Sequence, residues 1–153
     1  MDISEKRKPK RDRIQMIPKD VTGEKGLVLV DVTWGMIQPM QAADGVETVG
    51  EVEVNDHLEK GLPVIDARMH DSSGTPTIKN SKNIPHSEIV DRMDELNKEE
   101  QTIFFCNGPQ CPQSPTAIKG LLEAGYQADK ILYYRGGMHD WITLGLLVDE
   151  VKI

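Results

Sequence analysis

Residues 102–118 read TIFFCNGPQCPQSPTAI, so an apolar run, a polar loop and a helix start follow one another directly. The opening TIFF is typical of a strand buried on both faces, since β-branched and aromatic residues fill it. Ser114 and Pro115 predict a helix start, because serine caps helix N-termini and proline fits the first helical position. The apolar face of this helix continues through Leu122, and Gly125 predicts its end. The segment therefore joins a buried strand to a helix, as in an α/β fold.

Short strands and helices alternate on both sides of this segment from about residue 46 onward. The predictions rest on apolar runs, on alternation of polar and apolar residues, and on helical spacing of apolar residues. The expected strands cover 51–54, 62–65 and 131–134. One expected helix runs from Asn55 or Asp56 to before Gly61, and another covers 87–96. A polar loop is expected at 70–82. Repeated βαβ units predict a mainly parallel sheet with helices on both faces.

The length of 153 residues suits one domain with an N-terminal extension. We expect the domain at 46–150 and the extension at 1–45. The first 13 residues hold six basic and three acidic side chains, a pattern typical of a mobile, solvated tail or of a weak contact with an anionic partner. Residues 26–37 read GLVLVDVTWGMI and predict an extra strand. Trp34 and the segment up to Met40 could fold back over the domain as a lid or a dimer contact.

Charge and composition exclude several classes of protein. The formal net charge of −7 argues against a general nucleic-acid binder, which needs positive charge to displace counterions. No apolar run approaches the roughly 20 residues that span a bilayer, and the basic N-terminus has no apolar stretch behind it as a secretory signal would. Two cysteines are too few for a disulfide scaffold. We therefore expect a cytoplasmic protein without membrane or nucleic-acid partners, and thiol chemistry becomes the main question.

Cys106 lies where the TIFF strand is expected to end, at the edge of a parallel sheet where ligands bind. The following helix N-terminus and the amides of a curled loop favour an anion there, which would lower the pKa of the thiol and make it a nucleophile. The alternative is a buried cysteine that acts as a small apolar side chain. The loop residues expected to bind the anion are Asn107, Gly108, Pro109, Gln110, Pro112, Gln113 and Ser114.

Four segments resemble the rhodanese-like family of sulfurtransferases over about residues 46–148. VIDAR at 64–68 resembles the family's strand that ends in Asp-x-Arg, and NIPHS at 83–87 occupies the place of His-Ile-Pro-Gly-Ala. The segment from Phe105-Cys106 to Gly125-Tyr126 resembles the active-site segment, and GGMHDW at 136–141 resembles Gly-Gly-x-x-x-Trp. The resemblance implies a five-stranded rhodanese-like α/β domain and a persulfide on Cys106. It also implies a small sulfur donor such as thiosulfate, a thiol or cyanide-like acceptor, and no cofactor or metal. Asp66 and Arg68 are expected to pair and to shape the neighbouring loop, and the alternative is direct contact with the substrate.

The loop departs from the family pattern in length and in charge. Gln113-Ser114 stand where many members have Arg-Ser, so the cation that would meet an oxyanion is missing unless Arg135 or Arg68 reaches in. A phosphatase or arsenate reductase of the same fold is disfavoured too. Phosphate transfer needs an arginine six positions after the cysteine, and Pro112 occupies that position.

Cys111 admits four interpretations. It is a bystander, a resolving thiol that forms a disulfide with an oxidised or persulfidated Cys106, a metal ligand with Cys106 and a histidine, or the main nucleophile itself. The first function hypothesis is sulfur transfer through a Cys106 persulfide in a monomer or dimer. The alternatives are a sulfur carrier or thiol redox-sensing module that uses Cys106 and Cys111, and a catalytically silent interaction domain.

Overall fold

The computed structural model describes residues 19–20, 23–25, 28–29, 37–69 and 75–151. Its centre is a five-stranded sheet with the order β3-β8-β7-β4-β6, and every neighbouring pair is parallel. The strands are β3 (Glu47–Thr48), β4 (Val64–Asp66), β6 (Lys82–Asn83), β7 (Thr102–Phe105) and β8 (Ile131–Tyr133). This arrangement confirms the predicted α/β class and the parallel five-stranded sheet.

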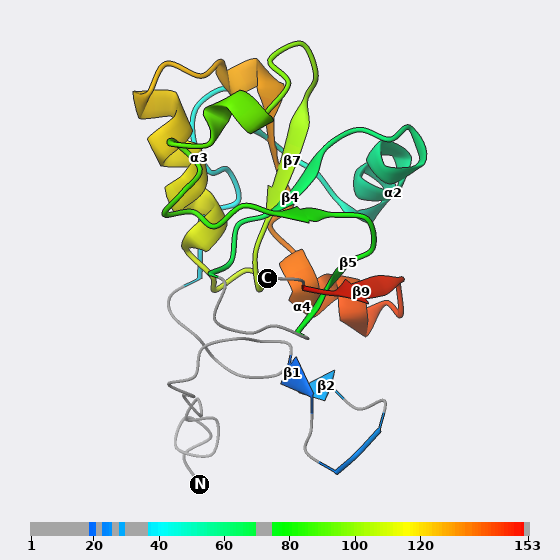
Figure 1. Ribbon diagram of the computed structural model, residues 1–153. Coiled ribbons are helices and arrows are strands. Elements are labelled where there is room, and N and C mark those ends of the chain that lie inside the picture. Colours follow the sequence, from blue (N-terminus) through cyan, green and yellow to red (C-terminus); the bar gives the residue numbers. More distant parts are fainter. Residues whose placement is uncertain (1–18, 21–22, 26–27, 30–36, 70–74, 152–153) are drawn as a thin grey trace, which may run out of the picture.

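Helices cover both faces of this sheet, as Figure 1 shows for α3 (Gln113–Glu123) on one side and α2 (Glu51–Glu59) on the other. Successive side chains of a strand point to opposite faces, so each buried strand serves two cores. In β7, Phe104 packs in the core under α3, whereas Ile103 and Phe105 pack with residues of α2 and α4 (Gly137–Thr143). Burial on both sides explains why three consecutive apolar residues follow Thr102 in this strand.

The predicted strand at 51–54 is wrong, because these residues form the first turn of α2. Gly50 is the N-cap, and its amide donates to Glu53 Oε2 at 3.0 Å. The buried residues of the helix are Val54 and His57, three positions apart on one helical face. Four residues of alternating polarity are too few to distinguish a strand from a turn of helix. The helix start expected at Asn55 or Asp56 therefore falls inside α2.

The expected helix at 87–96 is also wrong. The chain makes successive turns there, followed only by the 3₁₀ helix η1 (Met93–Glu95). Of the expected apolar face, Ile89 and Leu96 are buried, Met93 is half-buried and Val90 is 44% exposed, so the helical spacing identified only part of the inward surface. The predicted loop at 70–82 contains β5 (Pro76–Ile78) and the first residue of β6, while 70–74 lie outside the described residues.

Other predictions agree closely with the structure. The strands β4, β7 and β8 lie where expected, and α3 begins at Gln113, one residue before Ser114, so that Pro115 is its third residue. Gly125 follows α3 with a φ of 93°, a conformation that glycine adopts without strain. The sequence did not predict α4, the 3₁₀ helix η2 (Ala128–Lys130) or the strand β9 (Val148–Glu150), which pairs antiparallel with β5.

The extension is described only in part. Val28 and Leu29 form the short strand β2, which pairs antiparallel with β1 (Lys19–Asp20), while 26–27 and 30–36 of the expected extra strand lie outside the described residues. The basic head at 1–13 and Trp34 lie outside the described residues. None of the helices in the described part of the chain is long and apolar enough to cross a bilayer.

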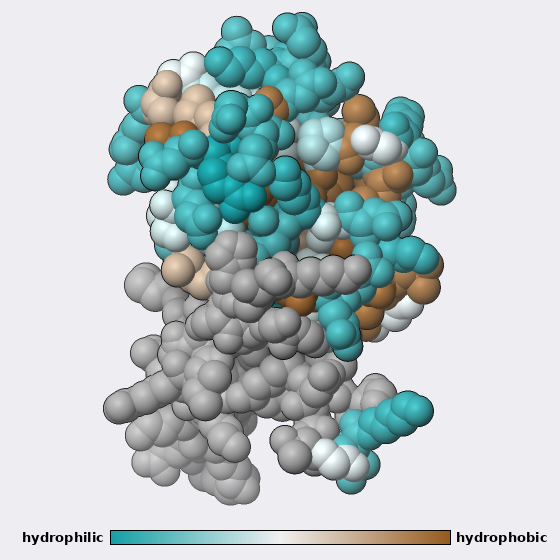
Figure 2. Space-filling model, viewed as in Figure 1, coloured by the Kyte–Doolittle hydropathy of each residue, from teal (hydrophilic) through white to brown (hydrophobic). Residues whose placement is uncertain are grey.

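Some of the exposed apolar side chains lie on α2 and on the corner formed by α4 and β9. Figure 2 shows brown atoms over α2 and over the corner formed by α4 and β9. Val52 on α2 is 80% exposed, and Leu144 and Leu147 after α4 are 60% and 68% exposed.

The core under α3 gives the first testable prediction. Leu121→Ala removes a fully buried side chain and should lower the free energy of unfolding by about 2–5 kcal/mol, measured by urea denaturation. The matched variant Leu144→Ala removes an exposed leucine and should change it by less than about 0.5 kcal/mol. Similar losses in both variants would contradict the described position of α3.

Candidate active site

Three predicted site residues follow the carboxyl ends of adjacent parallel strands. Arg68 comes two residues after β4, Cys106 directly after β7 and Arg135 two residues after β8. Because the strands are parallel, these residues meet at one edge of the sheet, where open α/β sheets bind ligands.

The start of α4 fixes the chain direction just after Cys106. Met138 N–H donates to the Cys106 carbonyl at 3.0 Å, and His139 N–H donates to the Asn107 carbonyl at 2.9 Å. A Cβ on Gly137 would collide with that Cys106 carbonyl and would lie 2.7 Å from the Gly108 nitrogen, so only glycine allows this approach. In a trans peptide the N–H points opposite to the C=O, so the Asn107 N–H faces the inside of the loop.

Cys106 is buried but has polar surroundings. Its side chain is 2% exposed, and its Sγ accepts a hydrogen bond from Ser114 N–H at 3.3 Å. Ser114 lies in the first turn of α3, where the N–H groups have no partner within the helix and favour an anion. As a thiol, Cys106 also donates to the Cys111 carbonyl at 3.4 Å. The sulfur therefore lies among polar groups of the loop and not in apolar packing.

The two thiols have pKa values shifted in opposite directions. Burial alone would raise the pKa of Cys106, but the Cys111 thiol and the side chain and N–H of Ser114 outweigh it and lower the value. Burial, the hydrogen bond to Cys106 and the negative charge of Cys106 together raise the pKa of Cys111 well above that of an ordinary thiol. Cys106 is thus the thiol that ionises first and the better candidate for the nucleophile.

Cys111 is fully buried within the same loop. The N–H groups of Asn107 and Gln113 partly offset the rise in its pKa, and Gln113 Nε2 donates to its Sγ at 3.5 Å. Gln113 Oε1 accepts from Met69 N–H at 3.0 Å, which fixes the orientation of the amide. The position that holds arginine in many relatives therefore holds a neutral amide directed at the second sulfur.

The expected ion pair between Asp66 and Arg68 is present and buried. Arg68 Nη2 lies 2.8 Å from Asp66 Oδ2, and their side chains are 1% and 0% exposed. The guanidinium also donates to the Pro76 carbonyl at 2.7 Å and to Asn107 Oδ1 at 3.3 Å, while Thr77 Oγ1 donates to the same Asp66 oxygen at 2.7 Å. Burial lowers the pKa of Arg68, but Asp66 more than offsets this and thiolate charges on Cys111 and Cys106 add to the rise. Arg68 thus places a charge near both sulfurs and holds the loop in position.

Arg135 contacts the end of the N-terminal extension. Its Nε and Nη2 donate to the Gln38 carbonyl at 3.1 and 2.9 Å, and Gln38 N–H donates to the Pro109 carbonyl at 2.7 Å. The end of the extension therefore contacts the outer side of the loop, a link that the sequence alone did not define.

The remaining predicted loop residues shape its turn. Cys111 N–H donates to the Gly108 carbonyl at 2.9 Å, which turns the chain back toward Cys106. Gln110 is partly buried and Pro112 is exposed. Within the ranges that the structure describes, no group of three or more His, Cys, Asp or Glu side chains is placed to hold a metal ion.

Sequence reasoning missed two supporting side chains, Thr77 and Asn83. Asn83 Nδ2 donates to the carbonyls of Asp66 and Arg68 at 2.8 and 2.9 Å, and so holds the backbone that carries the buried ion pair. Asn83 belongs to the NIPHS segment. The sequence indicated a family resemblance there but did not predict that the Asn83 side chain supports the backbone of the ion pair.

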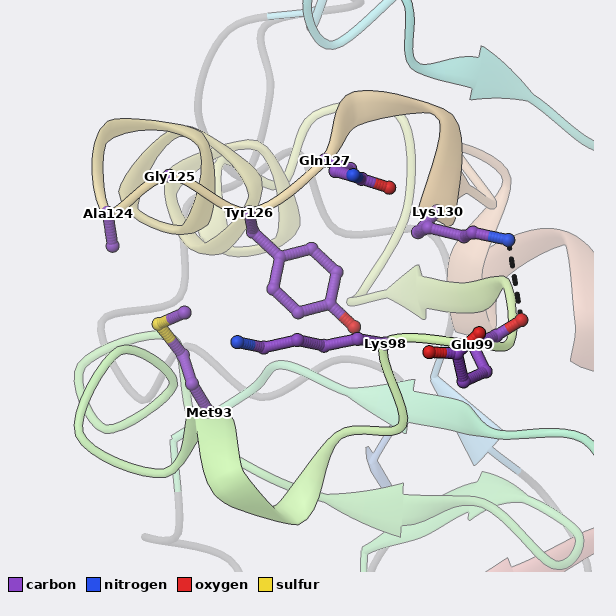
Figure 3. Close-up of a pocket in the computed structure, with 8 residues that line it drawn as sticks. All are labelled: Met93, Lys98, Glu99, Ala124, Gly125, Tyr126, Gln127 and Lys130. Carbon is purple, nitrogen blue, oxygen red and sulfur yellow. Dashed lines mark hydrogen bonds between the residues drawn. The ribbon is translucent and has the colours of Figure 1, made fainter.

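A separate cavity of about 460 Å³ lies elsewhere in the domain (Figure 3). Tyr126 lies in it beside Lys98, and Lys130 Nζ donates to the Glu99 carbonyl at 3.3 Å. Lys98 and Glu99 precede β7 and Lys130 precedes β8, so this cavity lies at the amino ends of the strands. It is therefore at the opposite edge of the sheet from Cys106.

Comparison with known proteins assigns the family. The family model described as a rhodanese-like domain matches residues 51–144, well over half of the chain, so the chain belongs to the rhodanese-like domain family. A rhodanese-like domain from Anabaena has a similar structure, with 20% identity, a TM-score of 0.57 and coverage of 68% of this chain and 79% of that one. A thiosulfate sulfurtransferase from Pseudomonas aeruginosa is similar with 23% identity, a TM-score of 0.55 and coverage of 71% and 22%.

A curated relative is larger than this chain. An HTH-type transcriptional regulator of Mycobacterium tuberculosis is 30% identical over 89 residues, which are 58% of this chain. The chain spans only 38% of the length of that regulator.

The buried ion pair gives the second prediction. Asp66→Asn leaves the Arg68 charge without its counter-ion and should lower the free energy of unfolding by about 3–5 kcal/mol in urea denaturation. The matched change Asp56→Asn breaks a pair with Lys60 whose side chains are 54% and 61% exposed, and should cost less than about 1 kcal/mol. Equal and small effects would show that the Asp66 charge is dispensable.

The opposite pKa shifts give the third prediction, read from the ultraviolet absorbance of thiolates during a pH titration. The wild type should show one step below and one above the value of an ordinary thiol, about 8.5. Cys111→Ala removes a hydrogen-bond donor and should raise the pKa of Cys106, whereas Cys106→Ala removes a neighbouring charge and should lower the pKa of Cys111. Shifts of the opposite sign would refute the described coupling.

Proposed function

We propose that this domain is a sulfurtransferase that moves sulfane sulfur from a donor such as thiosulfate to a thiophilic acceptor through a Cys106 persulfide. The observation that carries the proposal is the Ser114 N–H at 3.3 Å from Cys106 Sγ, at the start of α3. A peptide N–H fixed at a helix start can stabilise negative charge on this sulfur in both the thiolate and the persulfide. Membership of the rhodanese-like family supports the same chemistry.

In the first step the Cys106 thiolate attacks the outer sulfur of thiosulfate. A bond forms between Cys106 Sγ and that sulfur, the sulfur–sulfur bond of the donor breaks, and sulfite leaves with the bonding electron pair. The single negative charge of Cys106 moves to the terminal sulfur of the persulfide, so the site holds one negative charge throughout. The low exposure of Cys106, 2%, suits small donors and keeps water from the persulfide.

In the second step an acceptor such as cyanide or a thiolate attacks the terminal sulfur. The bond between that sulfur and Cys106 Sγ breaks, and the electron pair returns to Cys106 as thiolate. The cycle needs Cys106 in its reduced form, and both cysteines are free thiols. We therefore place the activity in a reducing compartment such as the cytoplasm.

The charges around the loop bear on the choice of donor. Gln113 replaces the arginine of many relatives, the Arg68 charge is balanced by Asp66, and Arg135 is held by the Gln38 carbonyl. A thiosulfate dianion therefore gains less from this loop than from one with a free guanidinium. We expect a high KM for thiosulfate and a lower one for a small alkyl persulfide, which carries less charge.

A sulfur carrier or thiol redox module is the second candidate, favoured by the second thiol beside Cys106. A carrier forms the persulfide but passes it slowly to free cyanide or small thiols. Steady-state turnover with these acceptors supports the transferase, and a long-lived persulfide without turnover supports the carrier.

The fourth prediction concerns the roles of the two cysteines. Cys106→Ser should lower the rate of sulfur transfer to cyanide by on the order of 10³-fold or more, because the hydroxyl is not ionised near neutral pH. Cys111→Ser should keep a substantial fraction of the rate, measured as thiocyanate formed. Unfolding curves of both variants serve as the control for folding, and equal loss in both would reverse the assignment of the nucleophile.

A further inference from the structure

The second thiol of the loop lies against the inner sulfur of the proposed persulfide. Cys106 Sγ is 3.4 Å from the Cys111 carbonyl, and each cysteine is among the causes of the pKa shift of the other. The turn closed by Cys111 N–H and the Gly108 carbonyl directs the end of the loop back toward its start. Cys111 is therefore next to the sulfur that stays attached to the protein.

Cys111 has its own set of hydrogen-bond donors. The Asn107 N–H faces it because the preceding carbonyl is bound by Met138, and the Gln113 N–H favours the same sulfur. Gln113 Nε2 adds a donor at 3.5 Å, and its orientation is fixed because Met69 N–H occupies the amide oxygen. A bystander cysteine needs none of these donors, whereas a thiolate formed during a reaction does.

We propose that Cys111 resolves the Cys106 persulfide and that the site thereby releases hydrosulfide when no acceptor takes the sulfur. This inference rests on the proposed function, because it needs the persulfide. The Cys111 thiolate attacks Cys106 Sγ, a bond forms between the two cysteine sulfurs, and the bond to the terminal sulfur breaks. The terminal sulfur leaves with that electron pair and the proton from Cys111, as hydrosulfide.

Electrons balance within this step. The sulfane sulfur gains two electrons, and the two cysteine sulfurs together lose two as they form the disulfide, so no external oxidant takes part. A dithiol such as dithiothreitol returns both cysteines to thiols and completes a cycle.

The position of the attacking group determines which of the two persulfide sulfurs it attacks. The Cys111 carbonyl contacts Cys106 Sγ, so the Cys111 thiol lies in the same part of the loop as the inner sulfur. Attack by Cys111 on the inner sulfur expels the terminal sulfur, whereas attack by an external acceptor on the terminal sulfur regenerates the Cys106 thiolate. The negative charge of Cys106 is one cause of the raised pKa of Cys111, after burial and the hydrogen bond between them. Persulfide formation moves this charge one atom further away, so Cys111 gives up its proton more readily at that stage than in the resting site.

The test loads the full chain with a small alkyl persulfide or with thiosulfate, removes the donor, and follows intact mass and free sulfide with time. The wild type should lose an added mass of about 32 Da, end about 2 Da below the reduced protein, and release about one sulfide for each chain. Cys111→Ser should retain the added sulfur and release sulfide at least about tenfold more slowly. Cys106→Ser should take up no sulfur, and Gln113→Leu should release sulfide more slowly than the wild type from an equal amount of added sulfur.

Other results would contradict either the role of Cys111 or the proposed function. If the wild type and Cys111→Ser retain the added sulfur equally long, Cys111 does not resolve the persulfide and the transferase proposal stands. If neither protein takes up sulfur, the proposed function itself fails. A disulfide between two chains, seen as a dimer on a non-reducing gel, would also overturn the internal reaction. Should Cys111→Ser unfold, Cys111→Ala tests the same step without a hydroxyl.

Discussion

The buried guanidinium of Arg68 is the constraint on which the arrangement of the site depends. A charge removed from water is stable only where fixed groups replace its hydration, and Arg68 finds them in Asp66, the Pro76 carbonyl and Asn107. These partners come from β4, β5 and the loop after β7, so one side chain sets the relative positions of three segments. The same charge lies close enough to both sulfurs to respond to their ionisation.

Helix α4 determines which groups the loop turns inward. It binds the carbonyls of Cys106 and Asn107 from outside, so the peptide that joins these residues presents its N–H to the interior. Helix α3 supplies the Ser114 N–H from the other end of the loop. The Cys111 thiol, together with the side chain and N–H of Ser114, thus lowers the pKa of Cys106 without an arginine in the loop. This explains how a loop with Gln113 and Pro112 can still stabilise a thiolate.

Strong local signals made the centre of the fold predictable. The TIFF strand, the helix start at Ser114 and the end at Gly125 each combine composition with a punctuating residue, and the structure agrees within one residue. Residues 51–54 failed because four alternating residues fit the first turn of a helix equally well. The contacts of Gln113 with Met69 and of Arg135 with Gln38 were beyond prediction, since they join segments 44 and 97 residues apart. Such contacts depend on tertiary packing, not on local pattern.

In the proposed mechanism, the second thiol of the loop competes with external acceptors for the persulfide on Cys106. With a single cysteine, the persulfide waits for an acceptor, and its lifetime depends only on access. With Cys111 against the inner sulfur, the lifetime also depends on how readily this second thiol loses its proton, which burial opposes and the donors from Asn107 and Gln113 favour. The same burial that protects the persulfide from water therefore also slows its internal resolution, and the balance between the two decides whether sulfur leaves attached to an acceptor or as hydrosulfide.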